Sequence, residues 1–228
     1  MKNPWIELTK NFRSPYILQE DRKAIEKYNK KAKSDYKIAV GSLPIPFIGD
    51  PFKAKVIFLQ LNPGLDWPIG FENQKDDFII RDKKYKEENL KNLLHKKMKF
   101  PFFDLNPDYR LYGGFRYWTK VLSSFIKEKK DYKIISKNIC CLEYFPYHSK
   151  KFDHGNIKLK NQEYLVYLLN KIIKKKNIQI IMMKGEKWWL KLVPELRGKY
   201  IKLKSTRNVI LSKNNLVNNF KKIEKIIK

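Results

Sequence analysis

The sequence predicts an α/β protein, a three-layer α/β/α sandwich with a central four-stranded parallel sheet. Four short apolar segments alternate along the chain with segments of helical periodicity, and this alternation is typical of parallel sheets covered by helices on both faces. Hydrophobic residues make up 43% of the 228 residues, which is enough for the core of one domain. We therefore expect a single domain over residues 1–228, with a helical N-terminal extension and loop at 1–50 and the α/β core at 51–228.

The expected elements begin with a helix at 15–33, where apolar residues have helical spacing among dense charge. The Pro- and Gly-rich stretch at 41–52 predicts a loop that contains no regular element. An apolar run at 56–61 ends at Asn-Pro-Gly, which predicts a buried parallel strand that breaks into a turn. The further expected elements are helices at 83–97, 115–129, 161–176, 186–196 and 214–228, and strands at 138–144, 178–183 and 200–203.

The charge of the chain predicts a polyanionic partner. Lysine and arginine total 50 against 23 aspartates and glutamates, so the formal net charge is +27. Such a field attracts nucleic acid, and we expect DNA, duplex or single-stranded, as the partner. AT-rich codon usage also inflates the lysine count, but it does not by itself produce this imbalance.

The cysteine and histidine pattern argues against a metal site. Cys140 and Cys141 are adjacent, and neighbours on an extended chain point to opposite faces, so they form neither an ordinary disulfide nor a metal-binding pair. His95, His148 and His154 have no zinc-ligand spacing. The sequence shows no secretory signal segment and no apolar run of membrane-spanning length. We expect no metal, no cofactor, no membrane association, a cytoplasmic location and a monomer.

Four short motifs occur along the chain, three of them at or just after the carboxyl ends of expected strands, where parallel sheets bind ligands, and one in the helix expected at 115–129. The chain reads LNPG at 61–64, FRYWTKV at 115–121, EYFPY at 143–147 and STRN at 205–208. In this order the four motifs resemble the uracil-DNA glycosylase superfamily, specifically its Asn-bearing mismatch-specific and single-strand-selective branches. The resemblance covers most of residues 50–220 and implies that superfamily's fold and the excision of a base from DNA.

The chain departs from the family pattern at several positions. Gln60 stands where the family has Gly before motif A, and Glu143 stands where it has the Asn that recognises the base. Leu203 and Lys204 replace the His and the first Pro of motif B. Residues 72–112 form a longer connection than compact members need, and two cysteines cannot supply the iron–sulfur cluster of other branches.

The resemblance gives two residues catalytic roles. Breaking an N-glycosidic bond leaves an oxocarbenium-like sugar and a base that carries negative charge. Asn62, held at a strand end, is expected to position the attacking water through its amide oxygen. His148 is expected to replace the missing motif B His as the donor to the leaving base. Two alternatives stay open: Asn62 only shapes the turn before Pro63, and His148 is a surface residue.

The base pocket is expected around the ends of the first two strands. The resemblance implies that Phe71 stacks on the extruded base, with Trp67 as its rival for that role; the alternative is that either residue is a lid or core aromatic. Glu143 accepts from the N4 amino group of cytosine and, if burial raises its pKa, donates to cytosine N3 in the protonated form. The alternative is that Glu143 points away and pairs with a lysine. The expected substrate-binding residues are Gln60, Leu61, Gly64, Phe71, Glu143 and Tyr147.

The loop after the last strand is the expected DNA contact. In the family this loop grips phosphate and inserts a wedge residue where the base leaves the stack, and Arg207 falls at the wedge position. The alternative is a solvated turn. The expected DNA-binding residues are Lys204, Ser205, Thr206, Arg207 and Asn208.

Together these expectations describe a monofunctional DNA glycosylase that hydrolyses the bond to a flipped base and leaves an abasic site. The favoured base is a modified cytosine, because Glu143 disfavours uracil and the connection at 72–112 makes room for a substituent. A role in defence against phage DNA is implied by resemblance alone. The alternatives are a uracil or thymine-mismatch repair glycosylase and a nucleic-acid-binding module of the same fold without activity.

Overall fold

The computed structural model describes the backbone of residues 1–10, 12–65 and 75–228, and the side chains of the same ranges except 75–81. Within these residues, five strands form one sheet in the order β1-β3-β2-β4-β5. Four of them are mutually parallel, which confirms the α/β class and accounts for the four expected strands. The parallel strands are β2 (Val56–Gln60), β3 (Ile139–Glu143), β4 (Gln179–Met182) and β5 (Ile201–Lys202).

The fifth strand, β1 (Phe47–Gly49), corrects the predicted strand count. It lies within the stretch at 41–52 that was expected to hold no regular element, and it pairs antiparallel with β3 at the edge of the sheet. An edge position tolerates the flanking prolines, which lack a backbone donor. Gly49 has a φ of 99°, and a Cβ there would lie 2.5 Å from the Ile139 carbonyl oxygen, so glycine allows the close approach to β3.

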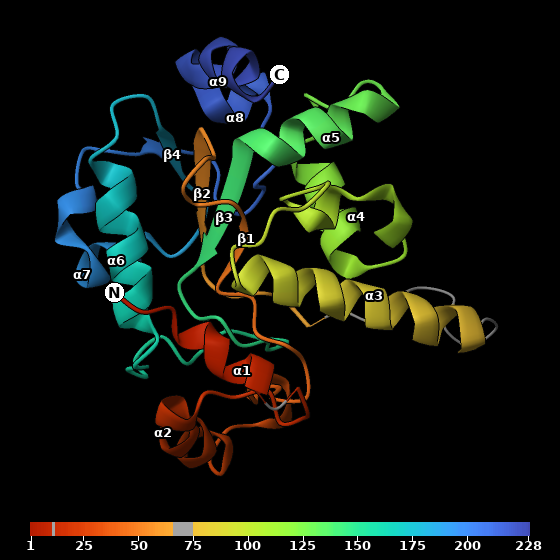
Figure 1. The fold of residues 1–228 in the computed structure, drawn as a ribbon. Helices are drawn as coiled ribbons and strands as arrows, with labels where there is room; N and C mark the ends of the chain where they lie inside the picture. Colours follow the sequence, from red (N-terminus) through yellow and green to blue (C-terminus); the bar gives the residue numbers. More distant parts are fainter. Residues whose placement is uncertain (11, 66–74) are drawn as a thin grey trace.

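Helices cover both faces of the sheet (Figure 1). Alternate residues of β2 enter separate hydrophobic clusters, with Ile57 and Leu59 on one face and Val56 and Phe58 on the other. The first face packs against α6 (Gln162–Ile173) and α7 (Glu186–Leu192), and the second against α4 (Gly113–Val121), α5 (Lys129–Asn138) and α9 (Phe220–Ile227). The remaining described elements are α1 (Glu7–Lys10), α2 (Gln19–Asn29), α3 (Lys75–Leu93) and α8 (Lys213–Leu216), and the 3-10 helices at Pro4–Ile6, Ser34–Tyr36, Phe103–Leu105 (η4), Pro107–Tyr109, Pro194–Leu196 and Val217–Asn219.

Several helix boundaries differ from the expected ones, including those of α2 and of α7, which ends at Leu192. The helix expected at 115–129 ends at Val121, and a separate helix, α5, starts at Lys129. A capping box explains this start, because the side chains of Glu128 and Asp131 each accept a hydrogen bond from the other's backbone N–H. Helix α3 begins before residue 83, and the expected C-terminal helix is divided into α8 and α9.

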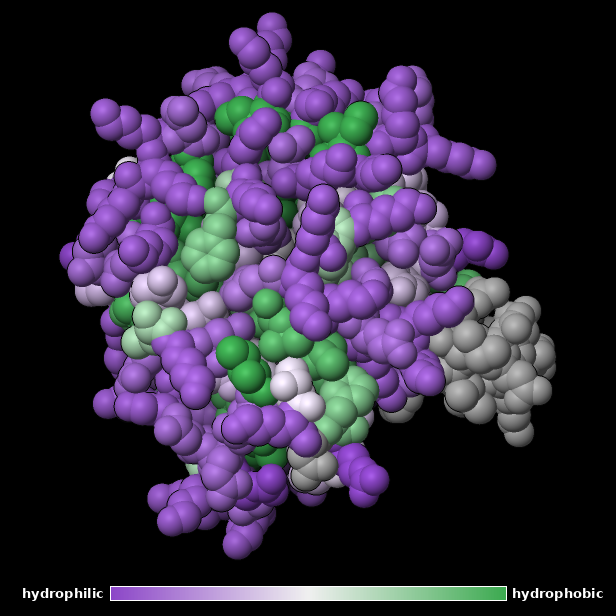
Figure 2. Space-filling model, in the orientation of Figure 1, coloured by the Kyte–Doolittle hydropathy of each residue, from purple (hydrophilic) through white to green (hydrophobic). Residues whose placement is uncertain are grey.

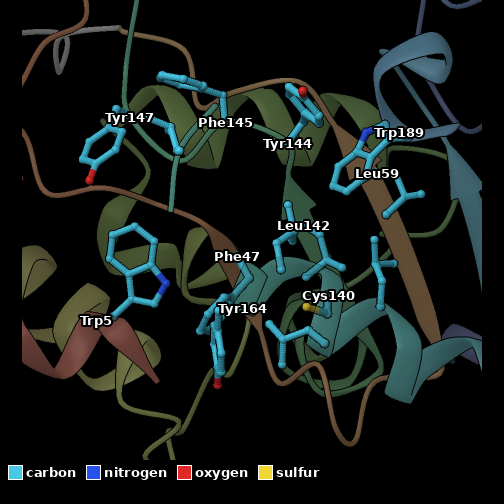
Figure 3. Close-up of a cluster of buried hydrophobic side chains, with 14 of the residues drawn as sticks. Trp5, Phe47, Leu59, Cys140, Leu142, Tyr144, Phe145, Tyr147, Tyr164 and Trp189 are labelled. Carbon is cyan, nitrogen blue, oxygen red and sulfur yellow. The ribbon is translucent and has the colours of Figure 1, made fainter. Parts of the chain in front are cut away.

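The N-terminal extension packs into the same core as the sheet. Trp5 and Tyr147 are buried side by side with their ring centroids 6.3 Å apart (Figure 3). The Tyr147 hydroxyl donates to Asp21 Oδ2 at 2.8 Å and accepts from the Leu18 N–H at 3.2 Å. Asp21 is itself buried and also accepts from the Asn161 amide. This polar junction ties α2 to the chain that leaves β3.

The junction predicts a stability effect. Tyr147→Phe removes the hydroxyl and leaves buried Asp21 with one donor fewer, so we expect the free energy of unfolding to fall by about 1–3 kcal/mol. Urea denaturation of the wild type and the variant measures this difference. Tyr36→Phe, on a half-buried ring in the 3-10 helix at Ser34–Tyr36, is the matched control. Equal stability of all three proteins would contradict the structural role of the hydroxyl.

Candidate active site

A cavity of about 670 Å³ lies where β2 and β3 end. The chain leaving β2 lines it from Gln60 to Leu65, and Glu143 lines it at the end of β3. Further walls come from one face of α3, the start of α4, and the segment at 148–150. Strand β3 points toward the end of the molecule where α1 and α2 lie (Figure 1). The cavity therefore sits at the carboxyl edge of the parallel strands, as such sheets predict.

Asn62 is fixed at the rim of this cavity by its amide nitrogen. Nδ2 donates to Ser149 Oγ at 2.9 Å and to the Pro63 carbonyl oxygen at 3.1 Å. Both protons of the amide are thus engaged, which leaves Oδ1 to accept a hydrogen bond from another molecule. Asn62 shapes its turn, as the alternative interpretation held, and it also lines the cavity. The two roles are compatible.

Ser149 is the residue that sequence reasoning missed beside Asn62. It is only 2% exposed, although it lies between a histidine and two lysines in a stretch typical of a surface loop. Its position follows from the path of the chain after β3, where Ala39 and His148 form an isolated antiparallel bridge. No local sequence signal marks a serine whose partner is 87 positions away along the chain.

His148 lines the cavity, but its ring nitrogens are already occupied. Nδ1 lies 2.7 Å from the Gly64 carbonyl oxygen and Nε2 lies 2.9 Å from the Leu43 carbonyl oxygen. Only the imidazolium donates to both carbonyls, and burial lowers the pKa of His148 despite these two acceptors, which raise it. This arrangement does not fit the expected donor to a leaving base. His148 instead holds the turn after Asn62 against residue 43.

Glu143 points into the cavity and is 5% exposed, so the alternative in which it turns away to pair with a lysine is wrong. Its Oε1 lies 3.6 Å from the Cys141 thiol, and its Oε2 has no hydrogen-bond partner among the described residues. Burial raises the pKa of Glu143 to about 8, with a smaller raising contribution from Asp104 and a lowering one from Lys184. At neutral pH the side chain is mostly a neutral acid, which can both donate and accept.

The other expected pocket residues divide into two groups. Gln60, Leu61 and Gly64 line the cavity, and the Gln60 amide donates to the Tyr117 hydroxyl. Tyr147 does not reach the cavity, because its ring is buried in the core beside Trp5 (Figure 3); its expected contact with the base is corrected accordingly. Phe71 and its rival Trp67 lie outside the described residues.

The loop after β5 is exposed and does not line the cavity. Buried Asn215 organises it from below: its Oδ1 accepts from the Ser205 N–H at 2.7 Å, and its Nδ2 donates to the Asn208 carbonyl oxygen at 2.7 Å. Lys204, Thr206 and Arg207 are exposed on this scaffold. The loop is available to a large ligand at the surface, and its binding to DNA stays a prediction.

Asp104 of η4 is a second buried acid at the cavity that sequence reasoning missed. It is 2% exposed and accepts a hydrogen bond from the Tyr85 hydroxyl at 2.8 Å. Burial raises the pKa of Asp104 to about 6, while the bond from Tyr85 lowers it. The flanking sequence FFDL reads as a core segment, so an acid facing a cavity was not expected there.

Comparison of the chain with protein-family models, with curated proteins and with solved structures finds no match. Among the described residues, no group of three or more His, Cys, Asp or Glu side chains is arranged to hold a metal ion. Each helix in the same residues is too short or too polar to cross a membrane.

Proposed function

We propose that this protein is a DNA glycosylase that hydrolyses the N-glycosidic bond of a flipped cytosine-type base and leaves an abasic site. The observation that carries the proposal is that Asn62 and the neutral acid Glu143 line the same cavity at the carboxyl edge of the sheet. The amide nitrogen of Asn62 is held there by Ser149. The resemblance of LNPG at 61–64 to motif A supports the same assignment.

The two residues divide the chemistry between the sugar and the base. Asn62 Oδ1 accepts a hydrogen bond from a water molecule and orients it toward the anomeric carbon, so catalysis at the sugar rests on positioning. Glu143 donates from Oε2 to cytosine N3, and the base departs more readily as its negative charge is neutralised. Oε1, which accepts from Cys141, also accepts from the cytosine N4 amino group.

Uracil fits this arrangement poorly. The Cys141 thiol donates to Oε1 and so favours the Glu143 proton on Oε2. With the proton there, uracil in the same orientation places its N3–H against that proton and its O4 against the Oε1 acceptor. Both contacts are repulsive, which favours cytosine-type bases over the uracil and thymine alternatives. A cavity of about 670 Å³ is also larger than a pyrimidine ring needs, which supports a modified cytosine. Defence against phage DNA is one setting in which such an activity is useful.

A direct assay tests the function. The protein is incubated with DNA that contains uracil, thymine opposite guanine, cytosine, 5-hydroxymethylcytosine or glucosylated 5-hydroxymethylcytosine, and alkali-labile abasic sites are counted. We expect cleavage at a cytosine-type base. Cleavage confined to uracil or mismatched thymine identifies a repair enzyme instead. Binding without any cleavage identifies the inactive binding module, an alternative favoured by the occupied ring nitrogens of His148.

The basic surface predicts strongly salt-dependent DNA binding. The net charge is +27, and Figure 2 shows one face of the molecule that is mostly hydrophilic. We expect the logarithm of the association constant to fall with the logarithm of salt concentration at a slope of about 0.9 per neutralised phosphate. The double variant that carries Lys204→Ala and Arg207→Ala is expected to reduce the magnitude of that slope by about 1–2. The pair Lys221→Ala and Lys222→Ala on α9 is the matched control. A flat salt response would leave codon usage as the whole source of the lysine content.

Ser149 is expected to act as a positioning residue. Ser149→Ala releases one proton of the Asn62 amide, so we expect kcat for excision to fall about tenfold while KM for DNA hardly changes. Ser149→Thr keeps the hydroxyl and restores most of the rate, a rescue that a role in packing alone does not predict. Exposed Ser123→Ala is the control. A loss that appears in KM, or no loss at all, contradicts the role.

A further inference from the structure

One end of the cavity is lined by hydrogen-bond acceptors that nothing in the proposed chemistry uses. Tyr85 and Asn89 lie four residues apart on α3, so they share the helix face that lines the cavity. Asn89 is 2% exposed, and its Nδ2 donates to the Pro44 carbonyl oxygen at 3.3 Å. Its Oδ1 is buried and has no hydrogen-bond partner among the described residues. An unpaired buried acceptor costs stability unless a ligand completes it.

Asp104 adds a carboxyl group to the same end. Its side chain accepts a hydrogen bond from the Tyr85 hydroxyl, which joins it to the α3 face that carries Asn89. Gly114 makes room for it, since a Cβ at that position would lie 2.4 Å from Asp104 Oδ2. The charge of Asp104 contributes to the raised pKa of Glu143. Both acids line the same cavity.

The nearby lysine does not neutralise Asp104. Lys86, which also lines the cavity, forms an ion pair of 2.7 Å with Asp82 on the same helix. The ring of Tyr85 stacks on Tyr112 with centroids 4.4 Å apart, which holds the wall in place. We call this end of the cavity, formed by Tyr85, Asn89 and Asp104, the acceptor end. It offers oxygen acceptors and a carboxyl group. The described residues that line it include no free cation.

We propose that the acceptor end is a substituent-binding subsite, in which Asn89 and Asp104 accept hydrogen bonds from hydroxyl or amino groups carried by the base in the catalytic part of the cavity. This proposal rests on the glycosylase function and adds the chemistry of the substituent to it. Phosphate and carboxylate groups are excluded, because they bring further acceptors and negative charge to a site that already has both. Apolar groups leave the buried acceptors unpaired and gain less.

The test uses oligonucleotides with a single cytosine whose 5-position carries a methyl group or a chain of one to three carbons ending in a hydroxyl, an amino or a carboxylate group. Equilibrium binding and single-turnover excision are measured for each. We expect the best hydroxyalkyl or aminoalkyl base to bind at least about tenfold more tightly than the methyl base, and the carboxyalkyl bases to bind no better than the methyl base. The length series allows for the distance between the base and the acceptor end.

Two variants assign the effect to its residues. Asn89→Leu and Asp104→Asn are expected to reduce the preference over the methyl base toward one, whereas Asn170→Leu on an exposed position of α6 keeps it. If Asp104→Asn loses only the preference for aminoalkyl bases, the charge of Asp104 binds a cationic substituent. If it also loses the preference for hydroxyalkyl bases, Asp104 binds the substituent through a hydrogen bond of the kind that a hydroxyl group donates. Should either variant fail to fold, the substituent series on the unaltered protein still decides.

The outcomes separate the subsite from the glycosylase function. If the protein excises all the bases and binds them equally tightly, the subsite is refuted and the glycosylase function is supported. Tight binding of donor-bearing bases without any abasic product supports the subsite and refutes the glycosylase. Binding of carboxyalkyl bases as tight as that of hydroxyalkyl bases also overturns the subsite, because a cavity end made of acceptors cannot produce it.

Discussion

Asn62→Ala is expected to slow base excision at least about a hundredfold, equivalent to ~3 kcal/mol of activation free energy. The amide is held by Ser149 and Pro63 in the orientation that leaves Oδ1 for water, and alanine removes that acceptor entirely. DNA affinity is expected to change little, since phosphate contacts supply most of it. Single-turnover excision and equilibrium binding on the same oligonucleotide measure the two quantities separately.

Exposed Asn170→Ala on α6 is the matched control for this substitution. Asn62→Asp is a second informative variant, because it keeps an oxygen at the same place but adds charge and loses the donors to Ser149 and Pro63. We expect it to recover little of the lost rate. Excision by Asn62→Ala at the wild-type rate would reduce Asn62 to a turn residue and remove the main support of the proposed mechanism.

The sequence predicted the carboxyl edge of the sheet well, because strand periodicity and the turn after a strand are local signals. The apolar run at 56–61 and the Asn-Pro-Gly turn placed Asn62 at a strand end, and the same reasoning placed Glu143. Strand β1 was missed since it is only three residues long between prolines and turns, and its pairing with β3 is a long-range event. A short edge strand has too few residues for a periodic signal.

The side chains that complete the site were harder to predict, since the chain is irregular where they lie. After Glu143 the alternation of the strand no longer applies, so Tyr147 and Ser149 gave no indication of which way they point. Tyr147 turned into the core toward Asp21, whereas Ser149 turned toward Asn62. Asn89 and Asp104 reach the cavity only through the packing of α3 and η4 around it, and no motif encodes that contact.

The second large effect is expected at Glu143, through both base choice and pH. The pKa of about 8 lies above the ordinary carboxyl value because of burial, so the acid is protonated at neutral pH and loses its proton as pH rises through 8. Its surroundings include the Cys141 thiol, the Tyr117 hydroxyl, Lys184 and Asp104. We therefore expect excision of cytosine-type bases to be constant at neutral pH and to fall above about pH 8.

Stability is expected to follow the same titration. The folded state holds the Glu143 proton up to about pH 8, whereas the unfolded chain releases it near the ordinary glutamate value, so folding binds a proton between these limits. Stability must then fall as pH rises across that window. Glu143→Gln, which is neutral at every pH, is expected to remove the slope between about pH 6 and pH 8, and to leave below it the contribution of Asp104, whose pKa burial raises to about 6. The same variant is expected to flatten the decline in excision. Urea denaturation at several pH values measures the first effect without reference to any activity.

Base choice gives the sharpest test of Glu143. An asparagine at this position donates to O4 of uracil and accepts from its N3–H, and it carries no charge to repel the departing anion. Glu143→Asn is therefore expected to lose excision of cytosine-type bases and to gain some excision of uracil, while Glu143→Gln separates the loss of the acid from the change in length. Release of uracil, cytosine and 5-hydroxymethylcytosine is compared for the three proteins at pH 7. Robust uracil excision by the unaltered protein, with the same base choice in Glu143→Asn, would contradict the assignment of Glu143 as the residue that reads the base.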